Sequence, residues 1–311
     1  MRLGLFGLAF VSILAPSAVT AAENIDRSSD AASHLQRARA LAAAGDHTRA
    51  IAEQTSAIAL APTAEAFKAR AQSWALKRQC ELAVADFGRA IELAPRDADT
   101  YFRRAECLRI IGHTSAAEED LTKVLRFDRS SAAALRLRAH VRLADGRVSD
   151  ALTDLRWAAD YDPRDISLLQ LLGFARFANG DYEIAAENLA RSLRFRDDLR
   201  AMLLLYIARG KSGIDGREEL RKHVGYLRHR AWPFPAAALY LGHGTPEGVI
   251  EKAQDEAERC QAYFYVGYWL QLQGRRADGY GLLKKAANTC PKTLVEYETL
   301  TPELRRRRSW F

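Results

Sequence analysis

The stretch RAIELAP at residues 89–95 decides the fold, because the chain repeats it at a nearly constant interval. Copies or close variants of this phrase end at Pro62, Pro95, Arg129, Pro163 and Asp197. These endings lie 33, 34, 34 and 34 residues apart, and a later copy, KAANTCP, ends at Pro291. A fixed period of 20–50 residues is the signature of a repeat architecture. The sequence therefore predicts a chain of stacked, equivalent units.

Each unit contains two small residues on either side of a turn. The first small residue of the five consecutive units is Ala38, Ala71, Ala105, Ala139 or Gly173, and the second is Ala50, Ala83, Ala117, Ala151 or Ala185. The turns lie at Gly45, Arg78, Gly112, Gly146 and Gly180. Small residues let two helices approach closely, Gly ends the first helix with a left-handed cap, and Pro stops the second. The pattern predicts helix hairpins that stack into an all-α solenoid.

These residues resemble the tetratricopeptide repeat, which has two helices in 34 residues, small residues at these points and a closing Pro. The resemblance covers residues 31–198 as five units and residues 260–293 as one more, with Gly267, Gly274 and Gly279 in register. It implies a right-handed superhelical solenoid of antiparallel helix hairpins. Within it, residues 199–259 form a degenerate helical segment interrupted at Pro233 and Pro235.

The two ends of the chain are distinct from the repeats. Residues 294–311 are expected to form a helix that caps the last hairpin, followed by a basic tail at Arg305–Arg308. We interpret that tail as a solvated helix end, with an anionic-surface or nucleic-acid site as the alternative. Residues 1–22 combine Arg2, a short apolar run and small residues, which indicates a signal peptide cleaved near Ala21 or Ala22. The alternative is an uncleaved membrane anchor. Residues 23–30 are then a short linker.

Composition and motifs argue against catalysis. Hydrophobic residues make up 48% of the chain and charged residues 27%, with a net charge of +7, which are values of an ordinary globular protein. The GKS at residues 210–212 and the glycines of GHGTPEG at residues 242–248 lack the spacing of phosphate- or dinucleotide-binding loops. No His or Cys spacing suits zinc. We expect no enzyme activity, cofactor or metal, and no membrane span after cleavage of the signal peptide.

A charge pattern recurs with the repeats. Four units carry an arginine before the first small residue and an acid in the second helix, namely Arg37 with Glu53, Arg70 with Asp86, Arg104 with Asp120, and Arg138 with Asp154. In the fifth unit both change together, to Leu172 and Asn188. This paired loss favours salt bridges that hold the repeats in register over a basic ladder that binds a ligand.

In tetratricopeptide arrays the first helices line a groove that holds peptide segments. By resemblance, the groove-lining residues here are Arg39, Lys68, Gln72, Phe102, Glu106, Arg109, Arg136, His140, Phe174, Phe177, Phe264 and Tyr268. Interleaved aromatic and basic side chains suit an acidic, amphipathic partner. The alternative for each Phe is packing against neighbouring helices. The arrangement that grips a C-terminal carboxylate is not reproduced, because Gln72, Arg103 and Ala133 replace its polar and basic residues.

Hairpin geometry assigns partners to the four cysteines, since export would favour disulfides. Cys260 and Cys290 lie at the same end of the last hairpin, and Cys80 starts one helix beside the expected end of the next, at Cys107. We therefore predict the disulfides Cys80–Cys107 and Cys260–Cys290. The alternative is four buried thiols.

Together these features favour a non-catalytic scaffold or adaptor of the bacterial periplasm that binds protein or peptide segments. The chain resembles the lipoprotein adaptors of peptidoglycan hydrolases, which implies a role in cell-envelope maintenance, although it has no lipid-attachment Cys after the apolar run. The alternatives are a regulatory subunit of an envelope enzyme system and an assembly factor for a pilus or secretion machine. Nucleic acid is not an expected partner, and the oligomeric state is left open.

Overall fold

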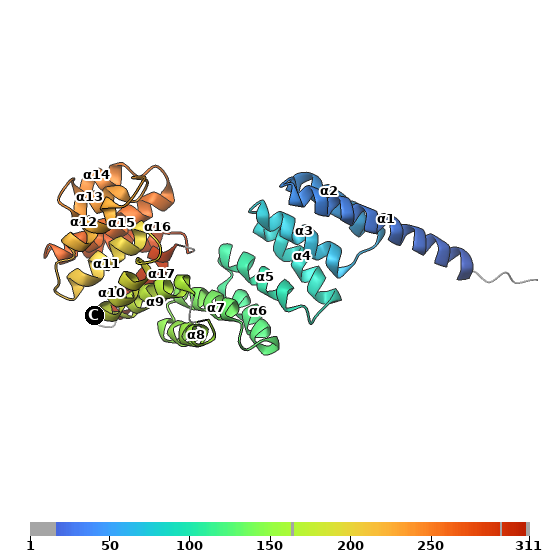
Figure 1. Cartoon of the computed structure of the whole chain (residues 1–311), viewed down its shortest axis with the longest axis horizontal. Helices are drawn as coiled ribbons and strands as arrows, with labels where there is room; N and C mark the ends of the chain where they lie inside the picture. Colours follow the sequence, from blue (N-terminus) through green and yellow to red (C-terminus); the bar gives the residue numbers. More distant parts are fainter. Residues whose placement is uncertain (1–16, 163–164, 293, 309–311) are drawn as a thin grey trace, which may run out of the picture. The chain divides into compact units, whose positions relative to one another are not determined.

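The computed structural model describes residues 17–162, 165–292 and 294–308, and every regular element in these ranges is an α-helix. The chain divides into two compact units, the first ending at Arg96 and the second beginning at Asp97 (Figure 1). The helices of the first unit are α1 (Ser17–Ala43), α2 (His47–Leu60), α3 (Ala64–Leu76) and α4 (Cys80–Leu93). Successive helices of this unit pack against each other, α1 on α2, α2 on α3 and α3 on α4.

The second unit begins with three further hairpins. Their helices are α5 (Ala98–Ile110), α6 (Thr114–Phe127), α7 (Ala132–Ala144), α8 (Val148–Tyr161), α9 (Ile166–Asn179) and α10 (Tyr182–Ser192). The remaining helices are α11 (Leu199–Lys211), α12 (Arg217–Gly225), α13 (Phe234–Tyr240), α14 (Pro246–Glu251), α15 (Glu256–Leu272), α16 (Arg276–Thr289) and α17 (Val295–Arg308). The partners within each hairpin, including α15 with α16, lie against each other. These pairs are the helix hairpins that the repeat pattern predicts.

The turns between paired helices adopt the predicted left-handed backbone. Gly45, Gly112, Gly146 and Gly180 have φ between 73° and 88°. Arg78 occupies the equivalent turn with φ of 60°, although an L-residue with a side chain rarely adopts this conformation. The turn geometry is therefore imposed by the hairpin and does not depend on glycine alone.

Small residues lie where paired helices cross. A Cβ added to Gly279 of α16 would come within 2.4 Å of the carbonyl oxygen of Gly267 on α15. Likewise, a Cβ on Gly173 of α9 would come within 2.6 Å of Leu189 Cγ on α10. Even one methyl group would separate these helices, which explains why the repeat keeps small residues there.

The predicted arginine–acid pairs all form inside the hairpins. Arg37 Nε donates to Glu53 at 2.9 Å and Arg70 Nε donates to Asp86 at 2.7 Å in the first unit. Arg104 and Arg138 each make two hydrogen bonds of 2.7–2.9 Å, to Asp120 and Asp154 respectively. The expectation of internal salt bridges is confirmed. In the fifth hairpin Asn188 instead donates to the backbone carbonyl of Ile184.

The segment between the fifth and last hairpins is helical but irregular. Pro233 precedes α13, and Pro235 lies in its first turn. Thr245 caps α14, because its hydroxyl accepts a hydrogen bond from Gly248 N at 3.1 Å. The predicted interruption at Pro233 and Pro235 therefore lies where the sequence indicated.

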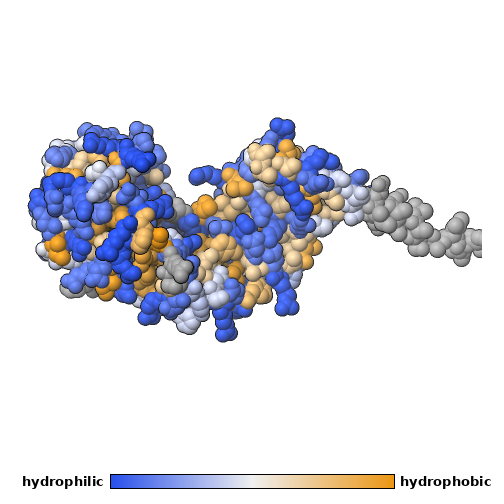
Figure 2. Space-filling model, viewed as in Figure 1, coloured by the Kyte–Doolittle hydropathy of each residue, from blue (hydrophilic) through white to orange (hydrophobic). Residues whose placement is uncertain are grey.

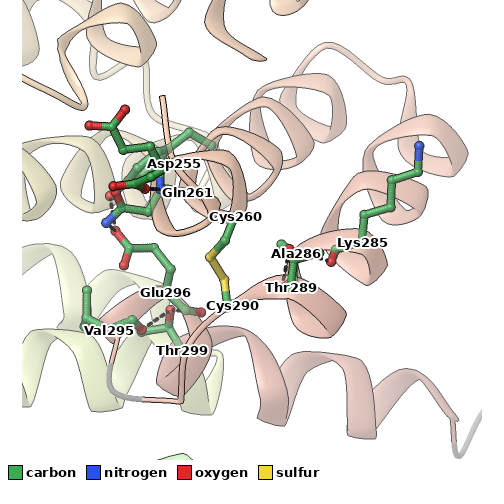
Figure 3. Close-up of a disulfide and its surroundings, with 12 residues drawn as sticks. Asp255, Cys260, Gln261, Lys285, Ala286, Thr289, Cys290, Val295, Glu296 and Thr299 are labelled. Atoms are coloured by element: carbon green, nitrogen blue, oxygen red, sulfur yellow. Dashed lines mark hydrogen bonds between the residues drawn. A yellow bond between two sulfur atoms is a disulfide. The ribbon is translucent and has the colours of Figure 1, made fainter. Parts of the chain in front are cut away.

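One of the two predicted disulfides forms. Cys260 of α15 and Cys290, the residue directly after α16, are joined with their Cα atoms 5.0 Å apart (Figure 3). Cys80 and Cys107 are buried thiols and form no disulfide. That second prediction is wrong. Cys80 belongs to the first unit and Cys107 to the second, so the prediction paired residues of two separate compact units.

The N-terminal region differs from the expected linker. Residues 23–30 are helical and belong to α1, since the stretch contains no Gly or Pro that would end a helix. Residues 1–16, which carry most of the expected signal peptide, lie outside the described residues, and so do residues 309–311 of the basic tail. Within the part of the chain that the structure describes, no helix combines the length and apolar character needed to cross a membrane.

Candidate functional site

The predicted groove residues of the first unit lie on α1 and α3 and are accessible. Arg39 of α1 is 68% exposed and forms an ion pair with Glu65 of α3. Lys68 and Gln72, one turn apart on α3, are partly exposed. This unit therefore presents basic and amide groups next to each other on its first helices.

In the second unit, α5 carries three of the predicted residues on one face. Phe102 and Arg109 are partly exposed, and Glu106 is exposed. The Nε of Arg109 is buried and has no hydrogen-bond partner among the described residues. The residue as a whole is partly exposed, so a partner molecule can approach its side chain. Arg109 is thus the basic residue of this set best placed to receive a carboxylate.

The predicted residues on α7 already have partners within the chain. Arg136 donates from one terminal nitrogen to Asp165 at 2.6 Å and to Ser167 at 2.7 Å, at the start of α9. His140 lies 3.0 Å from a carboxylate oxygen of Glu298, which belongs to α17. Arg136 therefore ties α7 to α9, and His140 ties α7 to the C-terminal helix. We call Phe102, Glu106, Arg109, Arg136 and His140 the inner face of the second unit.

The remaining predicted aromatic residues are core residues. Phe174 and Phe177 of α9 are 7% and 1% exposed, and Phe264 and Tyr268 of α15 are fully buried. Phe177 contacts Tyr268 edge to face with ring centroids 5.4 Å apart. The prediction that these four line an open groove is wrong, because α9 and α15 belong to one hydrophobic core.

The C-terminal helix occupies a place that the sequence did not indicate. It was expected to cover the last hairpin, but α17 packs against α7 and α9 as well as contacting α15 and α16 (Figure 1). Leu300 of α17 is fully buried in the common core. The capping helix therefore lies on part of the surface that the resemblance assigned to a partner.

Sequence reasoning also missed two buried acids on α17. Glu296 is 0% and Glu298 1% exposed. Glu296 accepts hydrogen bonds from Tyr265 Oη at 2.7 Å and from Gln261 Nε2 at 2.9 Å, and Figure 3 shows it pointing toward Gln261 beside the disulfide. Burial raises the pKa of Glu296, against the opposing effect of the hydrogen bonds from Tyr265 and Gln261. The available signal was the alternation of acids with apolar residues in VEYETL, residues 295–300.

Two surface cavities are formed by the described residues. A cavity of about 560 Å³ is lined by charged residues of α6 and of the turn before α8, where Glu118 pairs with Arg142 and Arg147. A second, of about 430 Å³, is lined by Tyr206, Tyr240 and Trp269 together with several glycines. In the described ranges no group of three or more His, Cys, Asp or Glu residues could hold a metal ion.

Large apolar residues are also exposed at one recurring position. Leu93, Phe127, Tyr161 and Phe195, at 34-residue spacing near the closing phrase, are 43–65% exposed. Figure 2 shows such apolar side chains scattered among hydrophilic ones on the visible surface of both units. Phe127 therefore provides an exposed aromatic residue with which Phe102 can be compared.

The chain was compared with known proteins. No family model matches the sequence, and no curated protein matches it. A tetratricopeptide repeat protein from Parabacteroides merdae has a TM-score of 0.59 over 89% of this chain and 99% of its own, at 13% identity. For PilF of Pseudomonas aeruginosa the TM-score is 0.53, over 73% and 100% of the two chains at 14% identity. The protein YrrB has a TM-score of 0.51 over 60% and 96%, at 19% identity.

The chain folds as a tetratricopeptide-repeat array. The sequence period, the helix hairpins and these structural similarities agree on this point. At such low identities the similarity concerns the fold alone.

Proposed function

We propose that the chain is a non-catalytic scaffold that binds a protein partner through the inner face of the second unit. The observation that carries this proposal is the position of Arg109, which lies two helical turns from the partly exposed Phe102 on the same face of α5 and whose Nε has no hydrogen-bond partner among the described residues. An arginine beside an aromatic residue is a frequent anchor in protein interfaces. An acidic, amphipathic segment would supply both the acceptor and the apolar contact.

The structural similarities support this class of function. YrrB is described as a tetratricopeptide repeat protein with an unusual peptide-binding site. Solenoids of helix hairpins present extended surfaces that commonly bind other chains.

We place this function in the bacterial periplasm, in maintenance of the cell envelope. Two features support this location, the apolar run at residues 3–15 followed by small residues and the disulfide Cys260–Cys290. N-terminal sequencing of the protein purified from its own cells is expected to begin at residue 22 or 23. A mature protein that begins at Met1 would contradict cleaved export.

A capture experiment tests the scaffold function. A tagged full chain that carries both Phe102→Ala and Arg109→Glu lacks both anchors. The amount of partner protein captured with it is expected to fall at least tenfold, roughly, relative to the unmodified chain. The matched control is Phe127→Ala with Arg126→Glu, which changes the same residue types at the exposed end of α6. Partner levels are compared by quantitative mass spectrometry, with circular dichroism to verify folding.

The two variants distinguish the inner face of the second unit from the exposed end of α6 as the binding surface. Loss in the inner-face variant alone supports the proposal. Equal capture by both variants would contradict it, and hydrolase activity of the purified protein alone would favour an enzyme.

A further inference from the structure

We propose that the space in which α17 lies is a binding site for an amphipathic acidic helix, and that α17 is its tethered occupant within the chain. A partner helix of the same chemistry would displace α17. This inference rests on the proposed function, since it identifies the class of segment that the scaffold takes.

The path of the C-terminal segment is the first observation. The disulfide at Cys290 fixes the point where the chain leaves the last hairpin. Lys292 then lies near the α5–α6 turn, its Cδ 3.9 Å from where a Cβ on Gly112 would stand. From Val295 onward, α17 runs against α7 and α9. The segment therefore leaves its own hairpin and returns to helices more than a hundred residues earlier in the sequence.

The contacts of α17 show which chemistry the site accepts. Glu296 and Glu298 are two residues apart and so point to nearly opposite sides of the helix. Glu296 meets Tyr265 and Gln261 of α15, whereas Glu298 meets His140 of α7 at 3.0 Å. Both acids are at most 1% exposed. The helix is thus held between two walls, one on α15 and one on α7, each with donors for a carboxylate.

An apolar contact completes the match. Leu300, four residues after Glu296, is fully buried in the core that Phe174 also joins. The site therefore fits a helix with two acids two residues apart, followed two residues later by leucine. This pattern agrees with the acidic, amphipathic partner predicted from the basic and aromatic residues.

Two features of the contacts made by α17 favour its displacement by a partner helix. The carboxyl group of Glu296 is fully buried, so α17 fills the site at a cost in desolvation. His140 is 34% exposed while the Glu298 side chain is 2% exposed, so a competitor can reach this contact from the histidine side. The tether keeps α17 at a high effective concentration, which a partner must exceed.

Peptide binding tests this proposal. The probe is a fluorescein-labelled peptide with the sequence of residues 294–308, titrated with the full chain and followed by fluorescence anisotropy. Leu300→Asp in the chain removes the buried apolar contact of its own α17 and is expected to bind the peptide at least about tenfold more tightly than the unmodified chain. Ile184→Asp, a similar change at a residue that is 45% exposed, is the matched control and should leave binding unchanged.

A charge exchange tests the assigned contact. In the Leu300→Asp chain, His140→Glu should reject the original peptide and accept a peptide with Glu298→Lys, a reversal of preference that a non-specific apolar surface would not produce. Hydrogen exchange should show lost protection of α17 but retained protection of α7 to α16.

The result that overturns the proposal is a folded Leu300→Asp chain that binds the peptide no better than the unmodified chain. If Leu300→Asp does not fold, Glu298→Ala provides the same comparison, because it loosens α17 without inserting a charge into the core. Unchanged peptide binding by the Glu298→Ala chain would again overturn the proposal. A dimer that exchanges α17 between two copies would overturn the in-chain assignment. Capture that depends on Phe102 and Arg109 while the peptide fails to bind would leave the proposed function standing.

Discussion

Replacing Asp120 by alanine is expected to lower the free energy of unfolding of the second unit by about 2–3 kcal/mol. Asp120 is 2% exposed and accepts two hydrogen bonds from Arg104, at 2.7 and 2.8 Å. The contact with Asp120 raises the pKa of Arg104, but an arginine side chain stays protonated in proteins even without such a partner. Removing the carboxylate therefore leaves a positive charge without its partner. Because the arginine side chain is 22% exposed, water relieves part of the cost. The effect therefore lies below the full cost of a completely buried charge.

The chain itself supplies the control for this prediction. The fifth hairpin replaces the pair by Leu172 and Asn188, so Arg104→Leu combined with Asp120→Asn copies that arrangement. The double variant should lie within about 1 kcal/mol of the unmodified protein, because no charge is left without a partner. Urea denaturation followed by circular dichroism measures both variants. A single variant as stable as the double would show that the pair does not hold the hairpin together.

Removing the disulfide is expected to have the second large effect. The double variant Cys260→Ser with Cys290→Ser opens a loop with a sequence separation of 30, for which the chain-entropy estimate is about 3–4 kcal/mol. The loss of stability should affect mainly α15, α16 and the first turn of α17, because the disulfide joins the two ends of the α15–α16 hairpin.

Reductant provides the control for the disulfide. Dithiothreitol should lower the denaturation midpoint of the unmodified protein and leave that of the double variant unchanged. Thiol labelling of the denatured, unreduced protein should modify two cysteines, Cys80 and Cys107. After reduction it should modify four. Four thiols before reduction, or equal midpoints for the two proteins, would contradict the bond.

The repeat architecture could be predicted from the sequence because its determinants are local and periodic. The glycine turns, the small residues at helix crossings and the arginine–acid pairs each depend on contacts within one hairpin, such as Arg104 with Asp120. Each of these features is a weak signal in a single unit, but together their recurrence in successive units makes the repeat recognisable. The pairing of Cys260 with Cys290 followed from the same hairpin geometry.

The failures concern contacts between distant parts of the chain. Nothing periodic marks the return of α17 to α7 and α9, so His140 was assigned to an external partner although Glu298 lies against it. Phe264 and Tyr268 match groove positions by repeat register, but irregular helices between the fifth and last hairpins bury them. The Cys80–Cys107 prediction also failed, and it paired residues that belong to different compact units.

The central claim is that the inner face of the second unit binds a protein partner. Site-specific photocrosslinking in intact cells tests it most directly, with a photoreactive phenylalanine placed at Phe102 in one strain and at Phe127 in another. We predict a discrete, light-dependent crosslinked product from position 102 that is absent from position 127 and is lost when Arg109→Glu is added. Crosslinking from position 127 alone, or from position 102 regardless of Arg109, would contradict the assignment of this face.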